Sequence, residues 1–293
     1  MSAIADMQAA PAAPARGYWK TVFAKLLRDK VTMACALVIL MLILMAIFAP
    51  WLAPEDPLKS SIFKRLKPIG TEGYPLGTDE LGRDMLSRLI FGARLSLVMG
   101  IAPVLMALAI GSLLGITAGF IGGRVNTAIM RTIDVFYAFP SVLLAIALSG
   151  ALGAGITNAL VSLTIVFISP IARVAESVTT QVRGREFVEA ARASGANAFT
   201  IVRVHVLGNV LGPILVYATS LISVAIILAA GLSFLGLGVK PPEPEWGLML
   251  NTLRQAIYVN PVLAALPGVM IFITSICFNL MSDGLRAAMD VKA

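Results

Sequence analysis

The sequence contains little charge. Charged side chains make up 13% of its 293 residues, whereas 58% of the residues are hydrophobic. In soluble globular domains about a quarter of the residues are charged. The shortage of charge therefore argues against a soluble domain and indicates a protein with several membrane-spanning segments.

Histidine and cysteine are also scarce. His205 is the only histidine, and the two cysteines, Cys35 and Cys277, lie in apolar stretches without a CxxC pair. A single histidine without neighbouring ligands excludes a zinc site and a nucleophilic triad. A GxxxxGK[ST] phosphate-binding loop is missing as well. We therefore predict no catalytic, metal-binding or cofactor-binding residue on this chain.

What the sequence does contain is long runs without Asp, Glu, Lys or Arg, at 31–54, 95–123, 135–172, 206–239 and 255–282. A transmembrane helix needs about 20 apolar residues. The third run is too long for one helix, and the Gly-rich segment 150–158 predicts a turn within it. The expected architecture is all-α with six transmembrane helices, near 31–50, 96–120, 132–150, 157–173, 210–232 and 262–282.

The basic residues indicate how these helices are oriented. With six spans and a cytoplasmic N-terminus, inward segments hold 14 of the 23 Lys and Arg residues, in agreement with the positive-inside rule. The formal charge of +7 then reflects membrane orientation, and no nucleic-acid partner is expected. The first apolar run is long for a signal peptide and is not followed by a small-residue cleavage site. We expect a retained first helix and both termini in the cytoplasm.

The segment between the first two spans carries a helical pattern. Leu81, Met85 and Leu89 recur every four residues, and Asp84 and Arg88 are spaced to pair. This pattern predicts an amphipathic helix over 78–93 at the outer membrane interface. Structural anchoring is favoured over a role in meeting an external partner, which stays open.

Small and polar residues within the spans suggest how the helices pack. Gly111, Gly115 and Gly119 form a repeated small-xxx-small pattern, which predicts close approach of another helix. The spans hold no charged residue at depth, as an ion-coupled carrier would require. The polar side chains in them either line a weakly polar passage or bond neighbouring helices: Asn158, Ser162, Thr164, Ser169, Ser220 and Ser223.

Residues 173–205 form a charged stretch between two apolar runs and contain eight charged side chains. Burying each of them in the bilayer would cost about 3 kcal/mol, so the stretch must leave the membrane, and the topology places it in the cytoplasm. Gly195 is expected to end a first short helix, and Asn197 to cap a second. Such a helical pair suits docking into a cleft, although a solvated loop with incidental helicity remains an alternative.

Several motifs carry a resemblance to a known family. "EAARASG" (189–195) fits the EAA-xxx-G signature of the permease subunits of ABC importers, and "VRVHVLGNVLGPILV" resembles the dipeptide, oligopeptide and nickel branch of that family. Further marks agree: "PLGTDELGRDMLSRLIFGAR" (75–94), "GLSFLGLGVKPPEPEWGLML" (231–250) and "NLMSDGLRAAMD" (279–290). The chain is identified as similar to the C-type permeases of this branch, which have the type I importer fold.

The resemblance implies roles for particular residues. The coupling helices that sit in a cleft of the ATPase subunit would include Phe187, Glu189, Ala190, Ala191, Gly195 and Phe199. Glu189 would contact the ATPase by charge, Gly195 would permit the turn, and Phe187 and Phe199 would be apolar contacts. Gly208 stands where the family usually has proline, which puts the rigidity of the exit from this loop in doubt.

The resemblance also implies a complex in the bacterial inner membrane. It would contain this chain, a sister permease, two ATPase subunits that carry ATP and Mg²⁺, surrounding lipid and an extracytoplasmic substrate-binding protein. The implied organisation is a cytoplasmic arm (1–30), a first helix with an outer segment (31–93) and a permease domain (94–286) with its coupling loop at 173–208. Segments 78–93 and "PPEPEW" (241–246) are candidate contacts for the binding protein.

The expected function is ATP-driven import of di- or oligopeptides, and other classes stay open as alternatives. The same machinery could carry nickel, metal chelates or other peptide-like solutes. A secondary carrier would need an intramembrane charge or an inverted repeat, and neither is evident. A membrane-embedded hydrolase would need a nucleophile and a base within the spans, and the one histidine lies at the end of the cytoplasmic loop.

Overall fold

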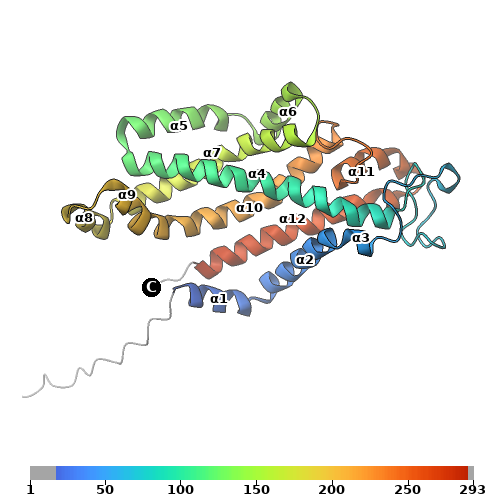
Figure 1. Cartoon of the computed structure of the whole chain (residues 1–293), viewed down its shortest axis with the longest axis horizontal. Helices are drawn as coiled ribbons and strands as arrows, with labels where there is room; N and C mark the ends of the chain where they lie inside the picture. Colours follow the sequence, from blue (N-terminus) through green and yellow to red (C-terminus); the bar gives the residue numbers. More distant parts are fainter. Residues whose placement is uncertain (1–17, 290–293) are drawn as a thin grey trace, which may run out of the picture.

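The computed structural model describes residues 18–289, and in this range the regular elements are all helices, with two isolated β-bridges in the segment before α4. Figure 1 shows the long helices lying side by side in one elongated bundle. The α-helices are α1 (Tyr18–Arg28), α2 (Lys30–Ile47), α3 (Ala49–Leu52), α4 (Met85–Ile121), α5 (Gly123–Tyr137), α6 (Ser141–Leu152), α7 (Ile156–Arg183), α8 (Glu186–Ala193), α9 (Ala198–Thr200), α10 (Leu207–Phe234), α11 (Trp246–Thr252) and α12 (Pro261–Met289). Three shorter helical segments are η1 (Ile62–Lys64), η2 (Ile201–Val206) and η3 (Leu253–Tyr258).

Five helical stretches in the described residues are long and apolar enough to cross a membrane. They are α2, α4, α7, the continuous stretch Ala198–Phe234 that includes α10, and α12. The pair α5 and α6 adds a sixth span if the two are counted together, although they are bent by 87° at the break between them. The third span expected as one helix over 132–150 is therefore broken, since Pro140 cannot donate a backbone hydrogen bond and disfavours helix in the residue before it.

The two ends of the bundle carry different elements (Figure 1). Residues 53–84 and α11 lie at the right-hand end, and α8, α9 and the described chain ends lie at the left-hand end. Because the positive-inside pattern assigns the first group to the outside, we name the right-hand end the outer end and the left-hand end the inner end. The part of the expected N-terminal arm that precedes residue 18 lies outside the described residues.

The separate interfacial helix expected over 78–93 is not present. Residues 78–84 are irregular, and Met85 begins the 37-residue helix α4. The carboxylate of Asp84 caps this helix by accepting a hydrogen bond from the Ser87 backbone N–H at 2.8 Å. Met85 and Leu89 are 0% and 5% exposed, so the apolar face of the pattern packs inside the protein. The pattern correctly indicated a helix from residue 85, but its apolar face covers protein instead of lipid.

The glycine pattern of the second span mediates the packing of α4 against α7. A Cβ atom added at Gly115 would lie 2.3 Å from the Ala172 carbonyl oxygen, and one at Gly119 would lie 2.7 Å from the Glu176 carbonyl oxygen. Only glycine permits backbones to approach this closely. The predicted close helix–helix contact is thus confirmed, and it joins α4 and α7 along much of their length.

Polar side chains inside the spans bond mainly to backbone carbonyls. Ser162, Thr164, Ser220 and Ser223 donate to carbonyls in the preceding turn of their own helices, a common arrangement for buried hydroxyls. Ser275 and Ser282 of α12 instead donate to the Ser223 and Val216 carbonyls of α10. The four hydroxyls named from the sequence therefore bond within their own helices, whereas the interhelical bonds come from two serines of α12.

Candidate coupling site at the inner end

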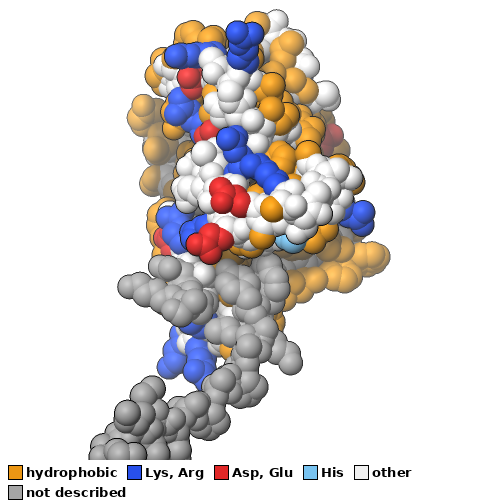
Figure 2. Space-filling view, turned by 90° about the vertical axis from the view of Figure 1, so that its left-hand side faces the viewer, with side chains coloured by type: hydrophobic (Ala, Val, Ile, Leu, Met, Phe, Trp, Pro, Cys, Tyr) orange, Lys and Arg blue, Asp and Glu red, His pale blue; other side chains and the backbone are white. Residues whose placement is uncertain are grey.

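The inner end is built by the chain that leaves α7 and returns through α10. Helix α7 ends at Arg183, and α8 begins three residues later at Glu186. In Figure 2, which looks onto this end, Lys, Arg, Asp and Glu side chains gather on the end face, whereas hydrophobic side chains cover much of the flanks. The part of the charged stretch that follows α7 thus forms a surface at the end of the bundle.

Gly195 closes α8 in the manner that the sequence predicts. Its φ angle is +81°, a conformation that glycine adopts at little cost. The N–H of Gly195 donates to the Arg192 carbonyl at 2.9 Å, and the N–H of Ala196 donates to the Ala191 carbonyl at 3.1 Å. This pair of bonds is a Schellman motif, so the turn after α8 is defined by its own backbone.

Asn197 begins the second helical stretch, also as predicted. Its side-chain oxygen accepts a hydrogen bond from the Thr200 N–H at 2.8 Å, which is the geometry of an N-cap. The short α9 continues into a π-helical turn, η2, and then directly into α10. Gly208 lies inside α10. The helix therefore continues through the position where the motif usually has proline, and the loop joins α10 without an interruption.

The loop has a small apolar core of its own. Val188, Ile201 and Val206 are 0–2% exposed. Phe187 and Phe199 are 42% and 74% exposed, so two aromatic side chains remain on the surface of the loop. Val188 lies in α8, whereas Ile201 and Val206 lie in η2. The periodicity of a single helix therefore could not have identified this core.

The six residues expected to contact an ATPase subunit lie mostly on the surface. Ala191 is partly buried, and the others are exposed: Phe187, Glu189, Ala190, Gly195 and Phe199. Glu189 is in the first turn of α8 together with Glu186. Among residues 18–289 neither of these two carboxylates forms an ion pair, so their charges are directed to solvent in this chain alone.

Other charged residues fasten the loop to the bundle. Arg192 of α8 lies over the ring of Phe120 in α4, 5.6 Å from its centroid. Arg183 donates to the Gly119 and Phe120 carbonyls at 3.3 and 3.2 Å, which neutralises the C-terminal carbonyls of α4. These contacts link the coupling segment to the tightly packed α4–α7 pair.

A hollow opens beside α8, with a volume of about 710 Å³. Arg185, Glu186 and Phe187 line it from the loop, and Asn209 lines it from the start of α10. The rings of Phe187 and His205 lie 6.4 Å apart at an angle of 43°. The single histidine is therefore an aromatic neighbour of the exposed Phe187, which the sequence did not indicate.

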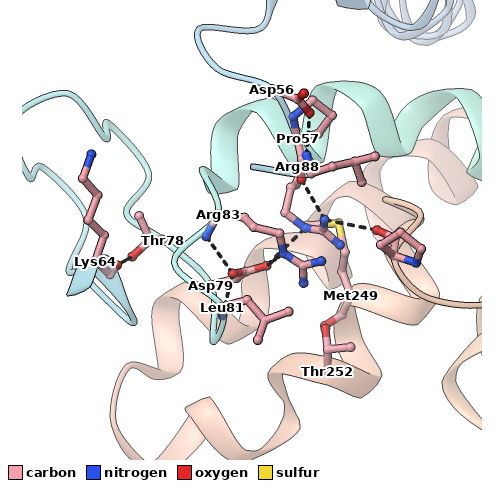
Figure 3. Close-up of polar contacts among 12 residues, drawn as sticks. Asp56, Pro57, Lys64, Thr78, Asp79, Leu81, Arg83, Arg88, Met249 and Thr252 are labelled. Atoms are coloured by element: carbon pink, nitrogen blue, oxygen red, sulfur yellow. Dashed lines mark hydrogen bonds and ion pairs between the residues drawn. The ribbon is translucent and has the colours of Figure 1, made fainter. Parts of the chain in front are cut away.

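The outer end contains a second polar cluster, which is buried (Figure 3). The Asp79 carboxylate lies between Arg83 and Arg88, at 2.6 Å from Arg83 Nε and 3.3 Å from Arg88 Nε. Arg88 also donates to the Pro57 carbonyl at 2.9 Å and reaches the Pro242 carbonyl at 3.5 Å. The expected pairing of Arg88 with Asp84 was wrong, since Asp84 caps α4. Arg88 instead ties two outer segments to that helix.

The outer segment "PPEPEW" is only partly a surface. Glu243 is exposed, but Glu245 and Trp246 are 1% and 0% exposed. Glu245 caps α11 by accepting hydrogen bonds from the Gly247 and Leu248 N–H groups at 2.9 and 2.8 Å. Burial raises the pKa of its carboxyl, and these bonds partly offset the rise. The second half of the motif is therefore part of the protein core and is not accessible as a contact surface for another protein.

The bend between α5 and α6 borders a partly open cavity of about 290 Å³ beside α7 and α10. Phe136, Tyr137 and Phe139 line one side, and Ser169 and Pro170 of α7 line the other. Asp134 of α5 forms an ion pair with Arg173 of α7, and the Arg173 guanidinium lies 4.6 Å from the centre of the Tyr137 ring. The lining is thus aromatic and weakly polar, with one ion pair beside it.

Two family models match the chain. Residues 111–292 match the binding-protein-dependent transport system inner membrane component, and residues 17–68 match the N-terminal TM domain of oligopeptide transport permease C. The first match covers well over half of the chain and includes α5 to α12 with the coupling segment.

Curated relatives align over nearly the whole length. The glutathione transport system permease protein GsiD of Pectobacterium atrosepticum is 41% identical over 274 residues, which cover 94% of this chain and 91% of that protein. The di/tripeptide transport system permease protein DppC of Pseudomonas aeruginosa is 42% identical over 284 residues, covering 95% and 92%.

A solved structure of the MetNI methionine ABC transporter, in an inward-facing conformation, shares the fold. Its matching chain superposes with a TM-score of 0.58 and 20% identity, and the match covers 70% of this chain and 97% of that chain. At this identity the match supports the architecture of the helices only.

Proposed function

This chain belongs to the inner membrane components of binding-protein-dependent transport systems, and we propose that α8 and α9 are the surface through which ATPase subunits drive it. The chain is the permease subunit of an ABC importer, a membrane component without an ATPase site of its own. The two short helices would pass the motion of the ATPase subunits on to the membrane spans.

The proposal rests on how α8 is held in place and on which of its side chains are exposed. Its C-terminus is closed by the turn at Gly195, Asn197 caps the helix that follows, and its buried side rests on Val188. Its other faces present Phe187, Glu189 and Glu186 without an intrachain ion pair among the described residues. A preformed helix with exposed aromatic and acidic groups fits a cleft of opposite charge on another protein.

The partners follow from the family. Two ATPase subunits would bind ATP and Mg²⁺ and hold α8 in a cleft, with Glu189 contacting a basic group there. A sister permease would complete the passage, and a substrate-binding protein would deliver the solute at the outer end. The complex would lie in the bacterial inner membrane with both ends of this chain in the cytoplasm, and residues 1–30, 31–93 and 94–286 would be its arm, first helix with outer segment, and permease domain.

The contacts at the inner end suggest how motion enters the bundle. Arg183 and Arg192 attach the loop to the end of α4, and the glycine-mediated packing holds α4 and α7 together. A displacement of α8 would then move α4 and α7 as one body, while η2 transmits it into α10. The Asp134–Arg173 pair joins α7 to the bent α5, so the same displacement would reach the aromatic cavity at the bend.

For the substrate we propose di- or oligopeptides. The support is the substrate in the name of the DppC relative, together with a cavity lined by aromatic and hydroxyl side chains that could accommodate a neutral or zwitterionic solute. Glutathione, named for the GsiD relative, is a related candidate, and nickel or metal chelates remain the alternative cargo for the same machinery.

The test of the coupling role is the charge reversal Glu189→Lys in the assembled transporter. Substrate-stimulated ATP hydrolysis is expected to be lost, because a basic cleft would repel the new lysine, while the permease stays folded because Glu189 is exposed and unpaired. Glu72→Lys, an exposed acidic residue at the outer end, is the matched control and should leave stimulation unchanged. Normal stimulation in the Glu189→Lys transporter would contradict the role given to this residue.

A further inference from the structure

Helix α1 is a short helix that is not part of a span. It precedes α2 and packs against α12 and α2 at the inner end of the bundle. The Asp29 carboxylate separates the two helices, since it caps α2 by accepting from the Val31 N–H at 3.1 Å and from the Thr32 hydroxyl. The chain therefore makes a distinct helix immediately before its first transmembrane segment.

The side chains of α1 divide into three flanks. Val22 is 3% exposed and lies on the side that packs against the bundle. Phe23 and Leu27, one helical turn apart, are 63% and 54% exposed. Lys25 and Arg28 are exposed on the opposite side of the helix. An exposed apolar flank between a protein contact and a cationic flank is typical of a helix lying in a membrane interface.

The length of α2 places α1 at the level of the lipid headgroups. With 18 residues at 1.5 Å per residue, α2 is about 27 Å long, close to the roughly 30 Å of a bilayer's hydrocarbon core. Just beyond its outer end, Trp51 is 78% exposed, as tryptophan is at membrane interfaces. The inner end of α2 then lies at the other interface, and Lys30, Arg28 and Lys25 lie within or near the headgroup layer.

The charge of this segment selects the kind of lipid. Residues 22–31 contain four charged side chains. Three are cations, Lys25, Arg28 and Lys30, and one is the anion Asp29. The exposed Asp29 carboxylate offsets one of these charges, so the net charge of the segment is positive. Exposed apolar side chains continue along the chain into α2, for example at Val31, so the apolar flank adjoins the lipid-facing surface of a span. That continuity favours a lipid partner over an ATPase subunit.

We propose that α1 is an interfacial anchor that binds anionic phospholipid headgroups through Lys25, Arg28 and Lys30 and inserts Phe23 and Leu27 beside the acyl chains. The anchor fixes the level of α2 and, through Val22, the position of the inner part of α12. Lipid binding by α1 can be measured in the absence of ATP and does not depend on the role proposed for Glu189. A negative result for lipid binding would therefore leave the proposed coupling role intact, and the reverse also holds.

The experiment uses the full chain in nanodiscs of phosphatidylcholine with or without phosphatidylglycerol. Binding is measured by cross-linking a phosphatidylglycerol that carries a photoreactive acyl chain, with the cross-linked peptides mapped by mass spectrometry. Wild-type protein is expected to cross-link within residues 22–31, and unlabelled phosphatidylglycerol should compete more effectively than phosphatidylcholine. Absence of cross-links in this range, or equal competition by both lipids, would overturn the proposal.

Charge variants separate specific binding from general attraction. Each cation near an anionic surface strengthens binding about five-fold, so the triple variant Lys25→Gln, Arg28→Gln, Lys30→Gln should need about a hundred-fold more phosphatidylglycerol for the same cross-linking. The control removes three exposed cations from the outer end, at Lys59, Arg65 and Lys240, and should leave cross-linking within residues 22–31 unchanged. An equal loss in both variants would mean general attraction only and would refute the assigned site.

The apolar flank is tested separately, in case the charge variant disturbs the fold. Phe23→Ser with Leu27→Ser keeps all three cations and alters only exposed side chains. Cross-linking from the acyl chain should fall, whereas the competition ratio between the two lipids should persist. If Phe23 were protected from modification only when ATPase subunits are bound, the flank would be a protein contact and the lipid proposal would be wrong.

Discussion

The two ends of this bundle use charged side chains in opposite ways. At the outer end Arg83, Arg88 and Glu245 are at most 5% exposed, and each is bonded within the chain. At the inner end Glu186 and Glu189 are exposed and form no ion pair among residues 18–289. The outer end thus bonds these buried charges within the chain, whereas the inner end leaves two carboxylates exposed. Substitutions at the outer end should therefore change stability, and those at the inner end should change coupling.

The largest expected effect is at Arg88. Arg88→Met removes a buried cation that joins Asp79, the Pro57 carbonyl and α4, and breaking such a buried network typically costs about 3–5 kcal/mol. Thermal unfolding of the purified chain in detergent is expected to shift to clearly lower temperature. Lys59→Met removes one partner of an exposed pair with Glu55 and should leave unfolding unchanged. If the two variants unfolded at the same temperature, the buried contacts of Arg88 would not stabilise the outer end.

A smaller effect is expected in the helix pair that connects the two ends. Gly115→Val forces a side chain against the Ala172 carbonyl, which lies 2.3 Å from the position of the new Cβ, and overpacking of this kind costs about 1–3 kcal/mol. Both stability and substrate-stimulated ATP hydrolysis should fall, since α4 and α7 would separate.

The matched control for that substitution is Gly150→Val in α6, where no atom lies within 4 Å of the added Cβ. Both changes introduce the same β-branched residue into a helix, so they differ only in what the side chain meets. If Gly150→Val were as damaging as Gly115→Val, helix propensity would explain the loss, and the close approach of α4 and α7 would not.

At the inner end, Gly195→Ala should affect coupling and leave global stability intact. The φ of +81° costs a non-glycine residue about 1–2 kcal/mol, and no atom lies within 4 Å of the added Cβ. If α8 docks as a preformed helix, the ATPase subunits should bind about 5- to 30-fold more weakly, with an unchanged unfolding temperature for the isolated chain. Gly184→Ala, at the other end of α8, has a φ of −86° and open space and should have no effect.

Local motifs made the inner end largely predictable. A glycine after an alanine-rich helix and an asparagine two residues later specify a Schellman turn and an N-cap through backbone chemistry, and both are present. The six-span architecture could be predicted for the same reason, because the absence of charge over about 20 residues has one common solution in a membrane.

The outer end could not be predicted in this way, because its contacts are long-range. Arg88 meets carbonyls 31 and 154 residues away, and Trp246 donates to the Leu89 carbonyl 157 residues away. The four-residue spacing of Leu81, Met85 and Leu89 correctly predicted that Met85 and Leu89 lie in a helix, but Leu81 lies before it. An amphipathic pattern does not distinguish a face that is buried in protein from one that is buried in lipid. The break at Pro140 was visible as a proline, but its 87° bend depends on the helices packed around it.

The smallest effect is expected for the loss of a helix N-cap, and two asparagine caps at opposite ends of the bundle can be compared. Asn197→Ala removes the bond to the Thr200 N–H, and Asn260→Ala removes a bond of 3.2 Å to the Leu263 N–H at the start of α12. Loss of such a cap costs about 1 kcal/mol. Because α9 belongs to the exposed coupling segment, Asn197→Ala should weaken ATPase binding about five-fold without lowering the unfolding temperature of the chain. Asn260→Ala should lower that temperature by a few degrees and leave ATPase binding unchanged. Titration of ATPase subunits and thermal unfolding of each variant measure both quantities, and a drop in stability for Asn197→Ala would mean that the inner end, too, is held together by the chain itself.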